Sequence, residues 1–204
     1  MKRGNFKNLL PYGNYEKVLL HICCAPDATY PVLYLRGRHY NVTGFFYNPN
    51  IHPKEEYEKR LGEAKKLSKE LYFTLIEGEY DPKTLRKWFA LTRGLEREKE
   101  GNYRCYLCYK ERLEKTAELA KELGFDYFTT TISISPHKRS EWVFEIGEEM
   151  ANKFNVKFLV ADFKKRNGFK SSVILSHFYR LYRQNYCGCI FSKVDASKSN
   201  KDIF

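Results

Sequence analysis

The stretch KVLLHICCAPDATYPVLYL, residues 17–35, contains the first strand–helix unit of the chain and decides its fold class. Its opening run, residues 17–22, is short and apolar, as in a strand that is buried on both faces of a sheet. A vicinal cysteine pair and a proline follow, and residues 28–35 then have the composition of a helix. The stretch therefore predicts a strand, an irregular turn and a helix.

The rest of the chain repeats this alternation. Apolar or β-branched strands are expected at residues 41–47, 72–77, 127–132 and 157–162. Amphipathic helices are expected at residues 54–71, 82–91, 110–123, 141–154 and 171–184. Such alternation predicts a three-layer α/β domain with a parallel sheet, in which ligands bind at the C-terminal ends of the strands. We expect a single domain over residues 1–204, with flexible ends at residues 1–14 and 194–204.

The composition bounds the class of protein. Hydrophobic residues make up 43% of the chain, which excludes a disordered protein. The 36 Lys and Arg residues against 25 Asp and Glu give a net charge of +11, which favours a polyanionic partner such as nucleic acid but also fits a merely soluble basic protein. No apolar run approaches the roughly 18 residues of a membrane span, and no secretory leader is recognisable. We expect a cytoplasmic protein with no membrane partner.

The cysteines are the most informative residues because all six fall into tight pairs. The pairs are Cys23-Cys24, Cys105-x-x-Cys108 and Cys187-x-Cys189. In a reducing cytoplasm, clustered thiols indicate metal or redox chemistry rather than structural disulfides. Six thiols exceed the four that a structural zinc ion needs, whereas a [4Fe–4S] cluster accounts for all of them either with two further redox thiols or beside a second metal.

The spacing of each pair suggests what it can do. Two residues between Cys105 and Cys108 allow both thiolates to face one metal centre. A single glycine between Cys187 and Cys189 allows either a tight chelate or a strained, easily reduced disulfide. Asp27 is either a further carboxylate ligand or the plain N-cap of the helix that follows.

Five segments carry a resemblance to a known family. They are LLHICCAP, FFYNPNIHPKEEYEKR, RCYLCYKERLEKTAELAKELGFDYFTTTISISPHK, ADFKKRNGF and LYRQNYCGCIFSK. Together they resemble the epoxyqueuosine reductases of the QueH type from about Val18 to Lys193. The resemblance implies reductive removal of the epoxide oxygen of epoxyqueuosine at the wobble position of tRNA, giving queuosine. It also implies an iron–sulfur site, no cobalamin, and an external electron donor.

The resemblance carries further expectations about the fold and the site. The fold should be similar to the nucleotide-binding (HUP-like) domain of tRNA-thiolating enzymes, with helical additions that carry the cysteine motifs and without a phosphate loop. Many relatives have a further cysteine where this chain has Asp27, so that residue is expected to be an auxiliary ligand. The chemistry that removal of the epoxide oxygen requires then makes Cys23, Cys24, Cys105 and Cys108 the expected [4Fe–4S] ligands. Cys187 and Cys189 are then expected either to form a redox dithiol pair or, with Asp27, to hold one additional iron that acts on the epoxide oxygen.

The tRNA partner agrees with basic and aromatic residues near the motifs. Candidates for phosphate contacts are Lys138, Arg139, Lys164, Lys165, Arg166 and Lys170, and candidates for base stacking are Tyr47, Tyr106, Tyr109, Tyr182 and Tyr186. The alternative function is a zinc-stabilised, non-catalytic RNA-binding module. A tRNA thiolase is a second alternative, which the lack of a glycine-rich phosphate loop disfavours.

Overall fold

The computed structural model describes residues 15–199, and side chains up to residue 194. Five parallel strands form one sheet in the order β3-β2-β1-β4-β5. The strands are β1 (Lys17–His21), β2 (Asn41–Phe46), β3 (Thr74–Glu77), β4 (Tyr127–Thr130) and β5 (Lys157–Phe158). The order reverses beside β1, because the chain moves outward through β2 and β3 and then returns to add β4 and β5 on the other side.

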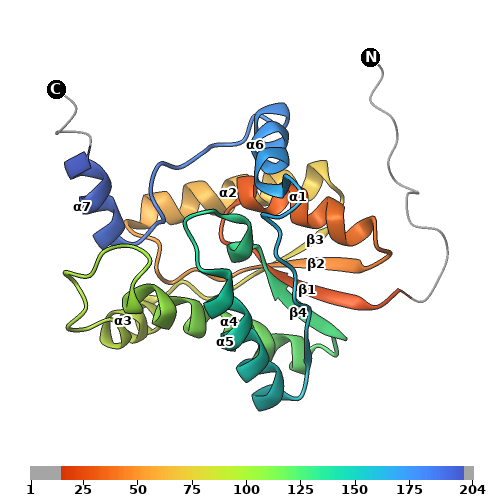
Figure 1. Ribbon diagram of the computed structural model, residues 1–204, viewed down its shortest axis with the longest axis horizontal. Coiled ribbons are helices and arrows are strands. Elements are labelled where there is room, and N and C mark those ends of the chain that lie inside the picture. The colour runs from red at the N-terminus through yellow and green to blue at the C-terminus, as the bar shows by residue number, and fades with distance from the viewer. Residues whose placement is uncertain (1–14, 200–204) are drawn as a thin grey trace.

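Helices cover both faces of the sheet, which gives three layers (Figure 1). The helices are α1 (Ala25–Arg36), α2 (Lys54–Glu70), α3 (Pro82–Leu91), α4 (Tyr103–Glu122), α5 (Ser140–Phe154), α6 (Gly168–Phe178) and α7 (Ile190–Ser199), with the 3₁₀ turn η2 (Thr131–Ile134). Helices α1, α2 and α6 lie on one side of the sheet, and α4 and α5 lie on the other (Figure 1). The predicted α/β class with a parallel sheet is confirmed.

Alternation along the strands divides the core in two. Val18 and Leu20 of β1 belong to the cluster under α1 and α2, whereas Leu19 belongs to the cluster under α4 and α5. Successive side chains of a strand point to opposite faces, so a strand in the middle of a three-layer domain must be apolar on both. This requirement explains why the first apolar run was recognisable as a buried strand.

Several predicted boundaries differ from the structure. Helix α4 begins at Tyr103 rather than residue 110, with Asn102 as its N-cap, so the Cys105–Cys108 pair lies on a helix. Helix α6 ends at Phe178 rather than residue 184, and Arg180 follows with a left-handed φ of 51°. The fourth strand gives way to η2, and β5 contains only two residues.

The chain ends also differ in part from expectation. The C-terminal segment, predicted to be flexible from residue 194, is helical in α7 as far as Ser199. Residues 1–14 and 200–204 lie outside the described residues, so the prediction for them is untested. Among the residues that the structure describes, no helix has the length and hydropathy that crossing a membrane requires.

Candidate metal and redox site

Three potential metal ligands meet where β1 passes into α1. The donor atoms of Cys23, Cys24 and Asp27 all lie within 4.8 Å of one another, and the Cys23 thiol is 3.4 Å from Asp27 Oδ2. Cys24 is the N-cap of α1 in an extended conformation, and Asp27 lies in the first helical turn. Asp27 is therefore not the N-cap, and the helix start turns its carboxylate back toward the two thiols.

This trio occupies the crevice at which the strand order reverses. The backbone N–H of Cys23 donates to Thr131 Oγ1 at 3.1 Å, which ties the end of β1 to the segment after β4. His21 forms a second tie, with Nδ1 2.9 Å from Thr130 Oγ1. Ligands of open parallel sheets bind at such a switch point. His21 itself is fully buried and hydrogen-bonded at both ring nitrogens, so it is a structural imidazole of the core.

The surroundings of the trio suit a bound cation. A hydrogen bond with Cys23, followed by burial, raises the pKa of the Cys24 thiol well above its ordinary value. Burial likewise raises the pKa of Asp27, partly offset by its hydrogen bonds with the two thiols. A metal ion would favour the thiolate and carboxylate forms that burial disfavours. Gln184 adds a hydrogen bond from Nε2 to Cys24 Sγ at 3.0 Å.

The second cysteine pair lies on the first turns of α4. Cys105 and Cys108 are three residues apart on a helix, and they therefore share one face. The backbone N–H of Gly101 donates to Cys105 Sγ at 3.2 Å. Cys108 packs in a small buried cluster with Trp88 of α3 and with Cys189.

The third pair lies in the segment that joins α6 to α7. Gly188 has a φ of 127°, a conformation that side chains rarely adopt, and this brings the residues on either side into a sharp turn. The backbone N–H of His52 donates to the carbonyl oxygen of Gly188 at 2.8 Å. Arg60 of α2 donates to the carbonyl oxygens of Tyr186 and Cys187 at 3.2 and 2.9 Å.

Cys187 lies near the other thiols of the second and third pairs. Burial, and then the charge of a Cys187 thiolate, raise the pKa of Cys105 and of Cys189. Burial also raises the pKa of Cys108 to about 11, with Arg112 acting in the opposite direction and Cys187 in the same one. The charge of Cys187 thus acts on the three other thiols of these two pairs, which together we call the Cys187 neighbourhood, whereas Cys23 and Cys24 surround Asp27.

This grouping differs from the one expected from the sequence. Within residues 15–194, the trio is the one group of three or more His, Cys, Asp or Glu donors at ligand spacing. Neither Cys23 and Cys24 with Cys105 and Cys108, nor Cys105 and Cys108 with Cys187 and Cys189, form such a group, so the ligands of a cluster remain a prediction. All six thiols are free rather than paired in disulfides.

Sequence reasoning missed several residues that surround the thiols. Lys138, expected to contact phosphate, is largely buried, and its Nζ donates to Cys187 Sγ at 3.0 Å and to Glu100 at 2.5 Å. Arg60 and Gln184 were not singled out, because a basic residue on a charged helix and a glutamine in a loop carry no local signal. The contacts of all three depend on tertiary packing.

The candidate stacking aromatics have varied surroundings. Tyr47 and Tyr109 are buried, with exposed fractions of 2% and 1%, so neither presents a free ring face to a large ligand. The Tyr186 hydroxyl donates to the carbonyl oxygen of His52 at 2.9 Å. The Tyr109 hydroxyl and Gln184 Oε1 are buried and lack hydrogen-bond partners among the described residues, so both can receive a ligand group.

The chain is similar in sequence to a known family of proteins. The family model described as "Epoxyqueuosine reductase QueH" matches residues 18–195. An epoxyqueuosine reductase QueH of Streptococcus pyogenes is 40% identical over 181 residues, covering 86% of this chain and 69% of the relative. That of Thermotoga maritima is 37% identical over 186 residues, covering 91% and 95% of the two chains.

Solved structures support the fold alone. A predicted subunit of a tRNA methyltransferase from Methanocaldococcus jannaschii aligns with a TM-score of 0.55 at 16% identity, over 79% of this chain and 74% of that one. The U34-tRNA thiolase NcsA from Methanococcus maripaludis, solved with its [4Fe-4S] cluster, aligns with a TM-score of 0.52 at 13% identity, over 94% and 67%. The expected similarity to the fold of tRNA-thiolating enzymes is confirmed.

Proposed function

Since this chain belongs to the epoxyqueuosine reductase QueH family, we propose that it removes the epoxide oxygen of epoxyqueuosine in tRNA with two adjacent metal sites built from its six cysteines. Membership of the family makes the chain an oxidoreductase. We further propose that it uses these metal sites rather than cobalamin. It would take its electrons from an external donor and act in the cytoplasm.

The observation that carries the proposal is the convergence of two thiol neighbourhoods at the switch point of the sheet. Cys23, Cys24 and Asp27 have donor atoms within 4.8 Å of one another and would hold a single iron ion. The Cys187 neighbourhood contains four thiols, the number that a [4Fe–4S] cluster requires. They are Cys105, Cys108, Cys187 and Cys189. This proposed partition differs from the one expected from the sequence, and the two make opposite predictions for Cys23.

Deoxygenation of an epoxide to an alkene consumes two electrons and two protons and releases water. A [4Fe–4S] cluster held by the thiols of the Cys187 neighbourhood would supply electrons one at a time, and an iron ion held by Cys23, Cys24 and Asp27 would supply a Lewis acid for the epoxide oxygen. The protein holds these ligands in place through residues outside the two groups. Thr131 fixes Cys23, Gln184 donates to Cys24 Sγ, and Lys138 donates to Cys187 Sγ.

Two of the buried atoms that lack hydrogen-bond partners among the described residues are the contacts we propose for the modified base. The Tyr109 hydroxyl can donate a hydrogen bond, and Gln184 Oε1 can accept one. Tyr109 is near Lys138, Cys105 and Cys187, whereas Gln184 touches Cys24. The two polar atoms thus belong to the two proposed metal sites, where they would hydrogen-bond the hydroxyl groups of the ring that carries the epoxide.

The test is anaerobic purification of the protein followed by metal, sulfide and activity measurements. We expect about five iron ions and about four sulfide ions per chain, with broad absorption near 400 nm, as the proposed groups require. With a chemical reductant, the same preparation should convert epoxyqueuosine tRNA to queuosine tRNA without added cobalamin. One zinc ion per chain with no sulfide and no turnover would overturn the proposal in favour of the RNA-binding module.

A further inference from the structure

The segment that leads into Cys187 has an unusual charge. Residues 163–186 contain six Lys and Arg residues and no Asp or Glu, in a chain whose net charge is +11. The six are Lys164, Lys165, Arg166, Lys170, Arg180 and Arg183, of which all but Lys164 are exposed. More than half of the net charge of the protein is therefore carried by helix α6 and its two flanking loops, which we term the α6 surface.

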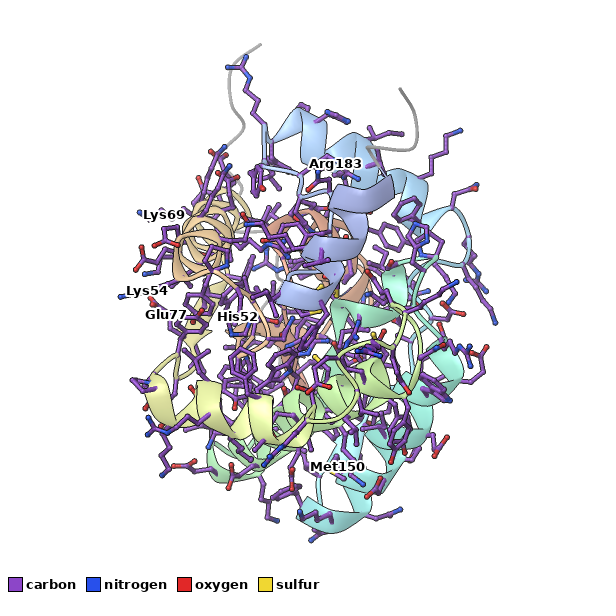
Figure 2. The ribbon with its side chains drawn as sticks, turned by 90° about the vertical axis from the view of Figure 1, so that its left-hand side faces the viewer. His52, Lys54, Lys69, Glu77, Met150 and Arg183 are labelled. Atoms are coloured by element: carbon purple, nitrogen blue, oxygen red, sulfur yellow. The ribbon has the colours of Figure 1, made fainter. Side chains whose placement is uncertain are left out.

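The α6 surface borders the candidate site at both of its ends. At its C-terminal end, Gln184 donates to Cys24 Sγ. At its N-terminal end, Lys164 Nζ is 3.2 Å from the carbonyl oxygen of Lys138, whose own Nζ contacts Cys187 Sγ. In Figure 2, Arg183 is labelled at the top of the face on which α7 lies in front. An anionic ligand held on this surface is thus delivered next to both groups of thiols.

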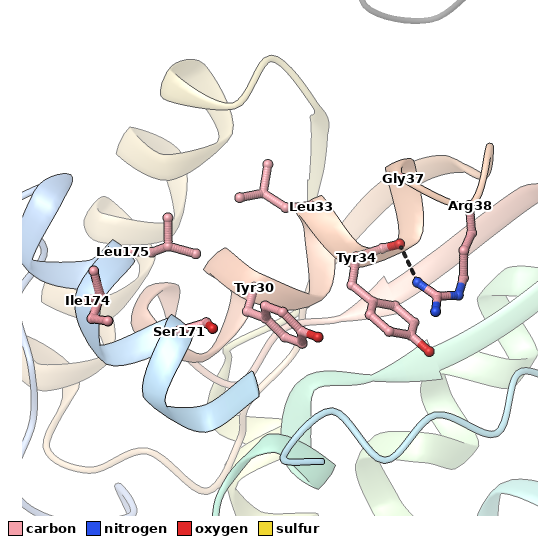
Figure 3. Close-up of a pocket in the computed structure, with 8 residues that line it drawn as sticks. All are labelled: Tyr30, Leu33, Tyr34, Gly37, Arg38, Ser171, Ile174 and Leu175. Carbon is pink, nitrogen blue, oxygen red and sulfur yellow. Dashed lines mark hydrogen bonds between the residues drawn. The ribbon is translucent and has the colours of Figure 1, made fainter. Parts of the chain in front are cut away.

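An open groove of about 510 Å³ separates α6 from α1 (Figure 3). Leu33 of α1 and Ile174 of α6 line it with side chains that are 40% and 60% exposed. The Arg38 guanidinium lies 3.6 Å from the centre of the Tyr34 ring, and its Nη1 donates to the Tyr34 carbonyl oxygen at 3.4 Å. Aromatic rings and flat guanidinium groups are the surfaces on which unpaired RNA bases stack.

We infer that the α6 surface docks the anticodon arm of the substrate tRNA, with phosphates on its Lys and Arg residues and an unpaired base in the α1–α6 groove against Arg38. The inference rests on the proposed function for the presence of a tRNA. Helix α1 runs from Ala25, beside Cys24, to Arg36, and at 1.5 Å per residue it spans about 18 Å. The groove lies toward the far end of this helix, so a base held there would belong to a nucleotide that is not adjacent to the reacting one.

Charge and chemistry favour RNA over the other polyanion that such a face can bind, an acidic membrane. The surface joins the thiol site at both ends, and a membrane-bound face would cover the entry of the modified base. The Tyr34–Arg38 pair also offers a stacking platform rather than an acyl-chain contact. Binding to acidic vesicles is accordingly an outcome that would overturn the inference.

The experiment compares Lys165→Gln/Lys170→Gln with the control Lys121→Gln in anaerobic, metal-loaded protein. Lys121 is exposed in the last turn of α4, whereas Cys105 and Cys108 lie at the start of that helix. The dissociation constant for epoxyqueuosine tRNA is measured from low to moderate salt. A plot of the logarithm of the tRNA association constant against the logarithm of the salt concentration should become less steep by about 0.7 for each lost phosphate contact. The double variant should therefore lose about 1.4 of the slope, and the control should not change.

A second variant tests the groove. Arg38→Ala should weaken tRNA binding about fivefold or more, as loss of a base-stacking platform does, with unchanged iron and sulfide content and unchanged kcat at saturating tRNA. If all variants bound tRNA with the affinity and the salt dependence of the wild-type protein, the inference would be overturned. Turnover by the wild-type enzyme would still support the proposed function in that case. Variants that lose affinity for phosphatidylglycerol vesicles but not for tRNA would overturn it as well.

Discussion

Arg60 Nη1 lies 2.9 Å from the carbonyl oxygen of Cys187, and this contact joins helix α2 to the last cysteine pair. The Arg60 side chain is 2% exposed, and its Nε is 2.6 Å from Glu56 on the same helix. Its Nη2 reaches the Tyr186 carbonyl oxygen, and its guanidinium lies 5.0 Å from the centre of the Tyr186 ring. The planar fork of an arginine thus satisfies two consecutive carbonyl groups of the turn that presents Cys187.

Replacing Arg60 with Met should destabilise the protein and weaken the Cys187 neighbourhood. Loss of one member of a buried ion pair leaves Glu56 with an uncompensated charge, at a cost of about 3–5 kcal/mol. The free energy of unfolding of the metal-free protein is measured in urea, and iron retention is measured under a chelator. Arg60→Lys is the matched control, because it restores the charge but not the fork, and its iron retention should fall between those of Met and Arg. Unchanged stability and iron retention in Arg60→Met would contradict this reading.

The partition of the cysteines predicts distinct losses of iron and sulfide. Cys105→Ala, Cys108→Ala, Cys187→Ala and Cys189→Ala should each lose most of the sulfide, because each removes one of four thiolates. Cys23→Ala and Asp27→Asn should retain the sulfide and lose about one iron ion per chain. The measurement is iron and sulfide content after parallel anaerobic purification. If Cys23→Ala lost the sulfide while Cys187→Ala retained it, the partition expected from the sequence would hold instead.

How far the sequence could predict this structure depends on whether a feature is local. The first strand was predictable because apolar residues at consecutive positions have few other uses, and β1 is buried on both faces. The start of α4 could not be predicted, because cysteine and tyrosine have only a modest helix propensity. Burial of Cys105 and Tyr109 in the core outweighs this modest propensity. The pairing of the cysteines predicts a metal or redox site, and the structure brings the donor atoms of Cys23, Cys24 and Asp27 together. Which other thiols lie near one another could not be predicted, because it is set by where α4 and the turn before α7 pack.

The contacts of Lys138 could not be predicted from the sequence either, because they depend on tertiary packing. Burial alone would lower the pKa of its ammonium group, but Cys187, Tyr109 and Glu100 raise it well above its ordinary value. The group is therefore a fixed positive charge that donates to Cys187 Sγ. Hydrogen bonds to sulfur and net charge both set the potential of a cluster.

Replacing Lys138 with Met should make the reduction potential of the bound cluster more negative, because the added electron loses a nearby cation. The expected shift is about 60 mV or more, a tenfold change in a one-electron equilibrium. It is read from the reduced-cluster signal in an anaerobic redox titration. Lys138→Arg keeps the charge and should shift the potential less. An unshifted potential in Lys138→Met with a full complement of iron would show that the cluster is not bound at Cys187.

Gly188→Ala should disrupt the last cysteine pair by local strain. At a φ of 127°, a Cβ atom would also approach Arg60 Nη1 and Ile51 Cγ1 to 3.0 Å each. Backbone conformations of this kind cost about 1–3 kcal/mol for a residue with a side chain. Gly124→Ala is the matched control, since Gly124 also has a positive φ, of 67°, but a Cβ atom there meets no described atom within 4 Å.

Both glycine variants should lose some stability in urea, because each places a side chain at a positive φ. Only Gly188→Ala should also lose iron and sulfide, because only there does relief of the strain move Cys187 and Cys189 relative to each other and to Arg60. The comparison therefore separates a general cost of folding from a specific cost at the thiols. Equal iron content in the two variants would mean that the conformation of this turn does not set the positions of its cysteines.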